Sequence, residues 1–260
     1  MVLPDDCQYH IALRAADLGS ATTALLPGDP DRVEPLARRL AQAVGGTLEP
    51  LARHREFTSC RLQWAQGCVV ICSTGIGGPS TAIATEELAR LGITRFLRVG
   101  TTGAIQPHIE IGDLVISRAA VRLEGASHHY APAAYPAVAG FDTTERLVAA
   151  ARATQVPWHL GITASSDTFW PGQERYDSYS GYVRRDFQGS LAEWRALKVA
   201  NFEMEAATLL TQCSVMGLEA GCLCGVIAQR VDSEVVDTSA YERISERWTQ
   251  LLAKALSEGL

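Results

Sequence analysis

The chain has 260 residues, of which 47% are hydrophobic and 20% are charged, a composition typical of a globular protein with its own core. Its 23 lysines and arginines and 29 aspartates and glutamates give a formal net charge of −6. This balance excludes general nucleic-acid binding through a basic face. The lack of a stretch of about 18 apolar residues excludes a transmembrane helix, so we expect no membrane partner.

Short apolar runs alternate with amphipathic stretches throughout, which is the pattern of an α/β protein. In chain order the pattern predicts a strand at 21–27, a helix at 31–43, strands at 57–64 and 68–73, a helix at 79–91 and strands at 95–99 and 113–123. It then predicts a helix at 143–153, strands at 158–164 and 197–202, a helix at 203–216, a strand at 221–230 and a helix at 239–256.

We find no linker and no repeat, so we expect one domain over residues 1–260. The two strands that meet at Gln66 and Gly67 require an antiparallel pair, which predicts a mixed sheet. Residues 165–198 show little periodicity, and an irregular segment of that length inside a domain is usually functional. The seven cysteines, an odd number with several in apolar runs, and an N-terminus unlike a secretory signal predict reduced thiols in a cytoplasmic protein.

Two loops between a strand and a helix, and one further strand end, are candidates for binding an anion. Residues 27–32, PGDPDR, place a glycine and an arginine where a helix begins, and helix N-terminal amides favour anions. Residues 73–80, STGIGGPS, form a glycine-rich turn that is neither a Walker loop nor a dinucleotide fingerprint. Residues 98–103, RVGTTG, combine an arginine with two hydroxyls at a strand end.

Two further segments have the groups needed for a nucleoside. In residues 167–175, DTFWPGQER, Gln173 and Arg175 can read the edge of a planar amide while an aromatic ring stacks on it. In residues 201–207, NFEMEAA, Glu205 can accept hydrogen bonds from a vicinal diol. Each of the five segments also has an ordinary structural interpretation: a tight turn, a salt-bridged arginine, a solvated loop, or a carboxylate (Glu203) at a helix N-terminus.

Taken together, these segments resemble the nucleoside phosphorylase family, which includes the hexameric purine nucleoside and uridine phosphorylases. Residues 73–88, STGIGGPSTAIATEEL, are similar to the family signature. The segments HREFTS, FLRVGTTGAIQPHI, VRLEGAS and NFEMEAATLL resemble the branch that cleaves uridine. The resemblance covers almost the whole chain and implies a three-layer α/β/α sandwich around a central mixed β-sheet.

The resemblance implies a pentosyltransferase that converts uridine and phosphate reversibly to uracil and ribose 1-phosphate. Inorganic phosphate is then the co-substrate, no organic cofactor is needed, and the chain assembles as a hexamer, a trimer of dimers. The implied phosphate ligands are Gly28, Arg32, Arg98, Thr101 and, from a neighbouring subunit, Arg55. The implied ribose contacts are Thr101, Met204, Glu205 and the neighbour's His10, and the implied uracil contacts are Phe169, Gln173, Arg175 and Arg230. A monovalent cation, K⁺, is implied at Glu56, Ile76 and Ser80.

Three alternatives stay open. A purine nucleoside phosphorylase needs an acid near residues 227–230 to protonate the base, and Ala228, Gln229 and Arg230 offer none, although Asp232 follows closely. A nucleoside hydrolase does not need several arginines for phosphate, and a non-catalytic nucleoside sensor does not need the full residue set. The adjacent His128 and His129 and the Cys222 and Cys224 pair are interpreted as structural, because neither has ligands at metal spacing.

Overall fold

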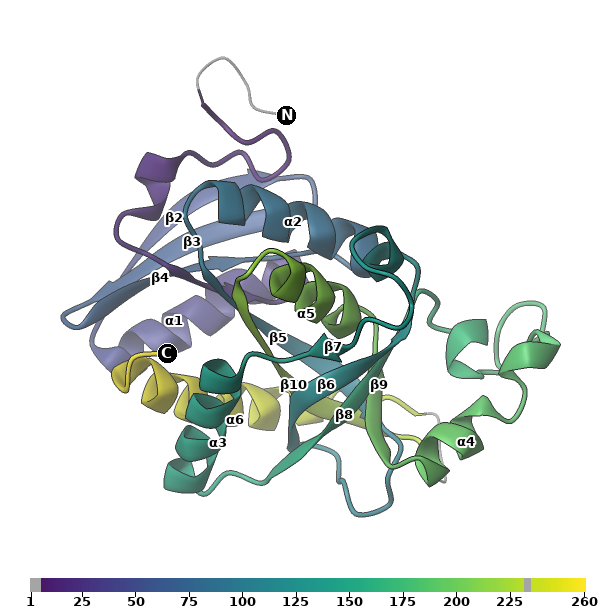
Figure 1. Ribbon diagram of the computed structural model, residues 1–260. Coiled ribbons are helices and arrows are strands. Elements are labelled where there is room, and N and C mark those ends of the chain that lie inside the picture. Colours follow the sequence, from purple (N-terminus) through teal and green to yellow (C-terminus); the bar gives the residue numbers. More distant parts are fainter. Residues whose placement is uncertain (1–5, 232–234) are drawn as a thin grey trace.

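The computed structural model describes residues 6–231 and 235–260, and a ten-stranded mixed sheet runs through its centre (Figure 1). The strands are β1 (Thr23–Leu26), β2 (Thr47–His54), β3 (Phe57–Trp64), β4 (Gly67–Cys72), β5 (Arg95–Ala104), β6 (Leu114–Leu123), β7 (Ala137–Val138), β8 (Trp158–Ser166), β9 (Val199–Glu203) and β10 (Glu219–Gln229). The α-helices are α1 (Val33–Val44), α2 (Gly78–Arg90), α3 (Phe141–Thr154), α4 (Ser190–Ala196), α5 (Ala206–Val215) and α6 (Ala240–Ser257).

Strand β5 belongs to two parts of the sheet at once. Its first half lies between β1 and β10 and is parallel to both, while its last two residues pair antiparallel with β9. Strand β10 also pairs with β6, β6 with β8, and β8 with β9, so these pairings close into a ring through β5. The middle of β5 is therefore the point where the open sheet becomes the ring.

Helices cover both faces of the sheet, as the three-layer prediction requires. Helices α1, α3 and α6 bury their apolar sides in one core cluster with Leu25, Leu97 and Leu223 of the sheet. Helices α2 and α5 pack into a second cluster with Ala24 and Phe96, which point to the opposite face. Figure 1 shows the two groups of helices on opposite sides of the strands. The predicted mixed α/β fold is confirmed, and the ring is a feature that the sequence pattern did not indicate.

Most predicted elements lie close to their expected positions. Helix α1 buries Val33, Leu36, Ala37 and Leu40, the apolar positions that recur at helical spacing. It ends at Gly45, whose φ of 66° lies in the left-handed region that glycine adopts at low cost. The sequence periodicity therefore gave a reliable guide to the elements that have one buried face.

Besides the two-residue strand β7, two elements were not predicted, because their burial gives no periodic signal. Strand β2 is an edge strand without a fully buried residue, and Pro50 interrupts its pattern beside an irregularity in the pairing with β3. Helix α4 lies inside the segment 165–198 and has no buried residue. The pattern of apolar residues depends on burial, so neither element produces it.

One helix begins later than the sequence predicted. The helix expected from residue 203 starts at Ala206, and Glu203 is the last residue of β9. Both Glu205 and Ala206 donate backbone N–H bonds to Glu203 Oε2, at 2.8 and 2.9 Å. The Glu203 carboxylate thus satisfies the free amides at the start of α5, and the chain cannot enter the helix before it.

The cysteines are free thiols in the described residues, and most of them are buried. Burial, with a smaller contribution from nearby Glu34, raises the pKa of Cys60 to about 12. Burial also raises the pKa of Cys72 to about 12. Thiols with such pKa values stay protonated and unreactive near neutral pH, in agreement with their interpretation as structural residues. Within the described chain, no helix is both long and apolar enough to cross a bilayer.

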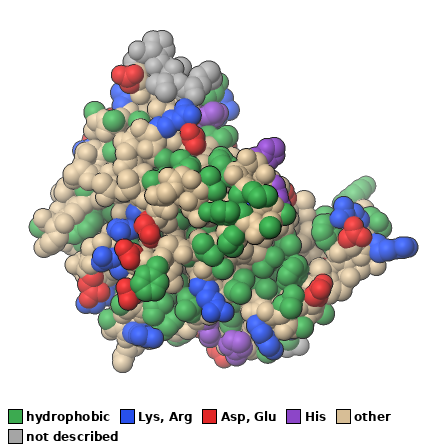
Figure 2. Space-filling view, viewed as in Figure 1, with side chains coloured by type: hydrophobic (Ala, Val, Ile, Leu, Met, Phe, Trp, Pro, Cys, Tyr) green, Lys and Arg blue, Asp and Glu red, His purple; other side chains and the backbone are tan. Residues whose placement is uncertain are grey.

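Hydrophobic side chains also gather on one outer face, over α3, β7 and α5 (Figure 2). Val138 of β7 and Phe141 of α3 are 44% and 75% exposed. Large apolar side chains at such exposure mark a surface available for contact with another molecule.

The contact between β10 and α6 gives a stability prediction. A Cβ atom on Gly225 would lie 2.2 Å from Cγ2 of Ile244, so Gly225→Ala forces α6 away from the sheet. We expect this variant to lose about 1–3 kcal/mol of unfolding free energy, as measured by urea denaturation. In Gly225→Ala/Ile244→Ala the loss should be smaller than the sum of the two single losses. Additive losses would show that the two residues do not share one contact.

Candidate active site

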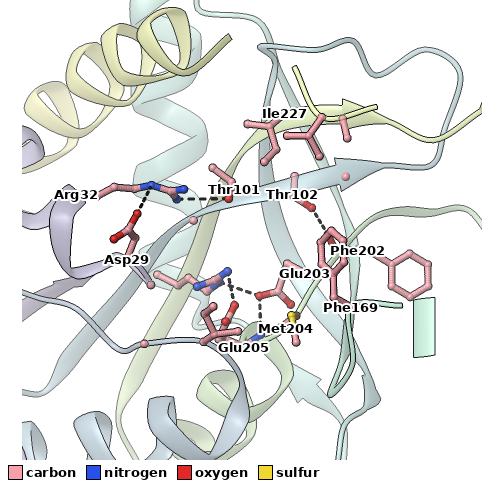
Figure 3. A pocket seen from close by; sticks show the side chains of 18 of the residues that line it. Asp29, Arg32, Thr101, Thr102, Phe169, Phe202, Glu203, Met204, Glu205 and Ile227 are labelled. Carbon is pink, nitrogen blue, oxygen red and sulfur yellow. Dashed lines mark hydrogen bonds and ion pairs between the residues drawn. The ribbon is translucent and has the colours of Figure 1, made fainter. Parts of the chain in front are cut away.

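A cavity of about 560 Å³ opens where β5 passes from the sheet into the ring (Figure 3). The loops after β1 and β4, the middle of β5, the segment after β8 and the ends of β9 and β10 all contribute to its wall. Ligands of α/β proteins collect beyond the carboxyl ends of strands. The predicted residues that line it are Gly28, Arg32, Glu56, Ile76, Ser80, Arg98, Thr101, Phe169, Gln173, Arg175, Met204 and Glu205.

Arg98 lies at the floor of this cavity and forms ion pairs with two glutamates. Its Nε is 2.8 Å from Glu203 Oε2, and its Nη2 contacts Glu205 Oε2. All three side chains are about nine-tenths buried or more. On β5, Arg98 lies opposite Leu26 of β1 and Cys222 of β10, so the backbone around it is held on both sides.

The three charges leave one excess negative charge, which backbone N–H groups compensate. Glu203 accepts the two N–H groups at the start of α5, and Gly77 donates its N–H to Glu205 Oε1 at 2.7 Å. Ser165 also donates its hydroxyl to Glu203. Each carboxylate is therefore satisfied by an arginine and by backbone donors, which makes the burial of this cluster tolerable.

The charges of the cluster shift the pKa values of its members. Burial on its own lowers the pKa of Arg98, but Glu205 and Glu203 raise it more, so the net pKa lies above the ordinary value. Burial raises the pKa of Glu205, the Arg98 charge lowers it, and Glu203 raises it again, so its net pKa also lies above the ordinary value. Arg98 therefore stays charged at every physiological pH.

Two glycines leave space around the Arg98 guanidinium. A Cβ atom on Gly100 would lie 2.6 Å from Nη2 of Arg98, so no side chain can occupy that position. A Cβ atom on Gly28 would lie 3.2 Å from the Gly75 carbonyl oxygen and 3.9 Å from Nη1 of Arg98. A small anion can thus approach the guanidinium beside the backbone of residue 28.

A second arginine, Arg32, faces the same end of the cavity. It lies in the short 3₁₀ turn Pro30–Arg32, and its Nη1 is 3.4 Å from the Thr101 hydroxyl (Figure 3). Its Nε is 3.6 Å from an oxygen of Asp29, and its Nη2 donates to the Tyr241 hydroxyl at 3.1 Å. The structure therefore brings Gly28, Arg32, Arg98 and Thr101 together as the sequence predicted.

The opposite end of the cavity holds a planar, polar group of side chains. The Arg175 guanidinium lies 4.2 Å from the centroid of the Phe169 ring, and Gln173 and Arg175 are both buried. Arg230 does not line the cavity. It lies behind the wall, where its Nη2 donates to the Gln173 carbonyl at 2.8 Å and its guanidinium faces the Phe202 ring.

Two predicted residues, His10 and Arg55, lie outside the cavity of their own chain. Arg55 contacts the Tyr9 ring and hydroxyl, and His54 Nδ1 lies 2.8 Å from the His10 carbonyl oxygen. The His10 ring Nδ1 is 2.7 Å from Glu87, a buried residue of α2. This separate cluster is the arrangement expected if both residues serve a neighbouring subunit.

Glu56 and Ser80 form one side of the cavity mouth. The Ser80 hydroxyl donates to Glu56 Oε1 at 2.9 Å, and Gly75 packs against both residues at a φ of 70°. The neighbouring Ile76 is 76% exposed. Within the described residues, no cluster of three or more His, Cys, Asp or Glu side chains could hold a metal ion. His128 and His129 lie in the turn Ala126–His129, away from the cavity lining.

Sequence reasoning missed three residues that contact predicted site residues. It assigned Glu203 only a possible part in the helix dipole, yet Glu203 is also an ion-pair partner of Arg98. It did not single out Glu87 or Tyr241, because both act across the fold on residues far away in sequence. Only the ExE spacing of Glu203 and Glu205 after a buried strand could have indicated the first of them.

Comparisons with known proteins agree with this geometry. A family model described as the phosphorylase superfamily matches residues 22–258. Uridine phosphorylase of Escherichia coli is 52% identical over 247 residues, covering 95% of this chain and 96% of its own. Uridine phosphorylase of Haemophilus influenzae is 50% identical over 248 residues, with 95% and 96% covered. That of Thermococcus kodakarensis is 48% identical over 227 residues, with 87% and 79% covered. The chain belongs to the phosphorylase superfamily.

Proposed function

We propose that the chain is a uridine phosphorylase, which converts uridine and inorganic phosphate reversibly to uracil and ribose 1-phosphate. One observation carries this proposal: a single cavity has arginines at one end, a glutamine–arginine pair at the other and a carboxylate between them. The named relatives support it, since three of them at 48–52% identity are uridine phosphorylases.

Phosphate is assigned to the end that holds Arg32 and Arg98. The Gly28 and Thr101 positions supply backbone and hydroxyl groups there, and the glycine leaves room for the anion. Paired guanidinium groups are the strongest phosphate ligands in proteins because they offer fixed, charged donors. They hold the nucleophile against the face of the sugar opposite the base, where it must attack.

Ribose is assigned to the middle of the cavity, beside Met204 and Glu205. A carboxylate with two oxygens can accept hydrogen bonds from both the 2′- and 3′-hydroxyls. As the glycosidic bond breaks, positive charge develops on the sugar ring, and the nearby Glu205 charge stabilises it. Glu203 takes no part in this contact, because it is occupied by Arg98 and by the start of α5.

Uracil is assigned to the end formed by Phe169, Gln173 and Arg175. The glutamine amide can accept a hydrogen bond from the imide N–H of uracil and donate one to a neighbouring uracil carbonyl. The Arg175 guanidinium stabilises the negative charge that the base acquires as it leaves. The uracil anion is delocalised over two carbonyls, so no acid has to protonate it. Arg230 supports this end through the Gln173 carbonyl. Asp232, the acid of the purine alternative, lies outside the described residues.

The assembly is proposed to be a hexamer built from dimers. In each dimer, His10 and Arg55 of one chain contribute to the cavity of its neighbour. The support is that both residues lie outside their own cavity, in one cluster with Tyr9 and His54. The exposed Ile76 at the cavity mouth provides an apolar contact for such a neighbour.

A monovalent cation, K⁺, is proposed between subunits at Glu56, Ile76 and Ser80. The donors fit, because a carboxylate, a hydroxyl and a backbone carbonyl are the hard oxygen ligands that alkali cations take. The 2.9 Å contact between Ser80 and Glu56 keeps two of these oxygens together. The bound cation supplies positive charge that offsets Glu56 at the contact.

The reaction itself provides the first test. In phosphate buffer, uridine should be converted to uracil, followed by ultraviolet absorbance, while ³¹P NMR detects ribose 1-phosphate. Without phosphate the conversion should stop, because the cavity holds the nucleophile and does not activate water. Equal uracil release without phosphate would establish a hydrolase, and faster phosphorolysis of inosine than of uridine would establish the purine alternative.

A substitution tests the base end. Arg175→Ala should lower kcat/KM for uridine by about 100-fold, because a charged donor to the leaving base is lost. Phosphate affinity, measured by isothermal titration calorimetry, should stay within about two-fold, since Arg32 and Arg98 are unchanged.

The matched control is Arg184→Ala. Arg184 also stacks on a phenylalanine of the same segment, 4.7 Å from the Phe187 ring centroid, but it does not line the cavity. This variant should keep the activity of the unmodified protein. If Arg175→Ala instead abolished phosphate binding, the two ends of the cavity would be assigned the wrong way round.

A further inference from the structure

Tyr241, near the start of α6, holds the Arg32 guanidinium from the side away from Thr101. Its ring centroid lies 5.0 Å from Cζ of Arg32, and its hydroxyl accepts a bond from Nη2 at 3.1 Å. Arg32 comes from the turn that precedes α1, so the contact joins two elements that are about two hundred residues apart in the chain. The Tyr241 side chain thus contacts one guanidinium through both its ring and its hydroxyl.

The chemistry of this partner suits an arginine that must stay available to an anion. A carboxylate would neutralise the guanidinium, whereas a tyrosine is uncharged at neutral pH and holds it through its ring and hydroxyl. Asp29 is the carboxylate near Arg32, and it is 3.6 Å from Nε, beyond hydrogen-bond distance. Asp29 thus forms only a loose ion pair with Arg32, and Tyr241 holds the guanidinium without adding a negative charge.

Arg32 and Tyr241 also border a second cavity. This cavity, of about 350 Å³, lies against α1 and α6, and both Arg32 and Tyr241 line it. Arg32 also lines the substrate cavity, so its side chain stands between two spaces. The Arg32 side chain is 27% exposed, which leaves it free to adopt other rotamers unless a partner holds it.

We propose that Tyr241 is a positioning residue for the phosphate end, which fixes the Arg32 guanidinium at the boundary of the two cavities, within reach of Thr101. The inference rests on the proposed function, which makes phosphate the ligand of Arg32. Tyr241 itself does not line the substrate cavity, so it acts only through the arginine.

A purely structural role for Tyr241 can be separated from this one. Next to it, Glu242 binds Arg39 of α1 through Nη2, at 2.6 and 2.8 Å, and so links the same two helices. If Tyr241 only fastened α6 to α1, loss of the Glu242 link would have a similar effect on phosphate binding. Glu242→Gln is therefore the matched control.

The experiment measures the affinity of the purified full chain for inorganic phosphate by isothermal titration calorimetry. Tyr241→Leu, which loses ring and hydroxyl but keeps an apolar side chain, should weaken binding about 10-fold. Tyr241→Phe, which keeps the ring, should weaken it about 3-fold. Glu242→Gln should bind phosphate like the unmodified chain. In steady-state kinetics, Tyr241→Leu should raise KM for phosphate while KM for uridine and kcat stay unchanged.

A double substitution completes the test, because Arg32→Gln/Tyr241→Leu should bind phosphate no worse than Arg32→Gln alone. The inference is overturned if Tyr241→Leu binds phosphate normally, if it raises both KM values equally, or if Glu242→Gln has the same effect. A different result is expected if the proposed function is wrong and only the inference about Tyr241 holds. The unmodified chain would then bind phosphate without cleaving uridine, and the titrations would still decide the role of Tyr241; a chain that binds no phosphate would overturn both proposals.

Discussion

The ion cluster of Arg98 with Glu203 and Glu205 is the constraint around which the rest of the site is arranged. A buried arginine is tolerable only when its charge is matched, and here two carboxylates from the end of β9 match it. Those carboxylates in turn need donors, which the first amides of α5 and the Gly77 N–H provide. One strand, one helix start and one glycine turn are thereby fixed around a single guanidinium.

This cluster also explains why two glutamates separated by one residue have different tasks. Glu203 has a structural role. Its carboxylate accepts hydrogen bonds from two backbone N–H groups and a serine hydroxyl, and it forms an ion pair with Arg98. Glu205 has fewer partners, namely the Gly77 N–H and Arg98, and burial raises its pKa. The first glutamate sets the position of the helix, and the second keeps more of its hydrogen-bonding capacity unused.

The alternating α/β pattern and the mixed sheet could be predicted because buried faces have local signatures, whereas the individual residues of the cavity were assigned largely from the family resemblance. Strand β2 and helix α4 were not predicted, because neither buries a regular face. The closed ring of strands through β5 was not predicted for another reason. It depends on the pairing of β5 with β9 and β10, which no local sequence pattern indicates. The contacts of Tyr241 and Glu87 are likewise long-range, so only a folded chain shows them.

Three of the side chains that line the cavity, Phe169, Gln173 and Arg175, lie on the segment after β8, outside the sheet, whereas Arg98 and Thr101 lie within β5. In Figure 1 this segment leads into the part of the chain that projects beside α4. The segment that holds Phe169, Gln173 and Arg175 can therefore change in sequence or length without altering the strand pairings that hold Arg98 and Thr101 in β5.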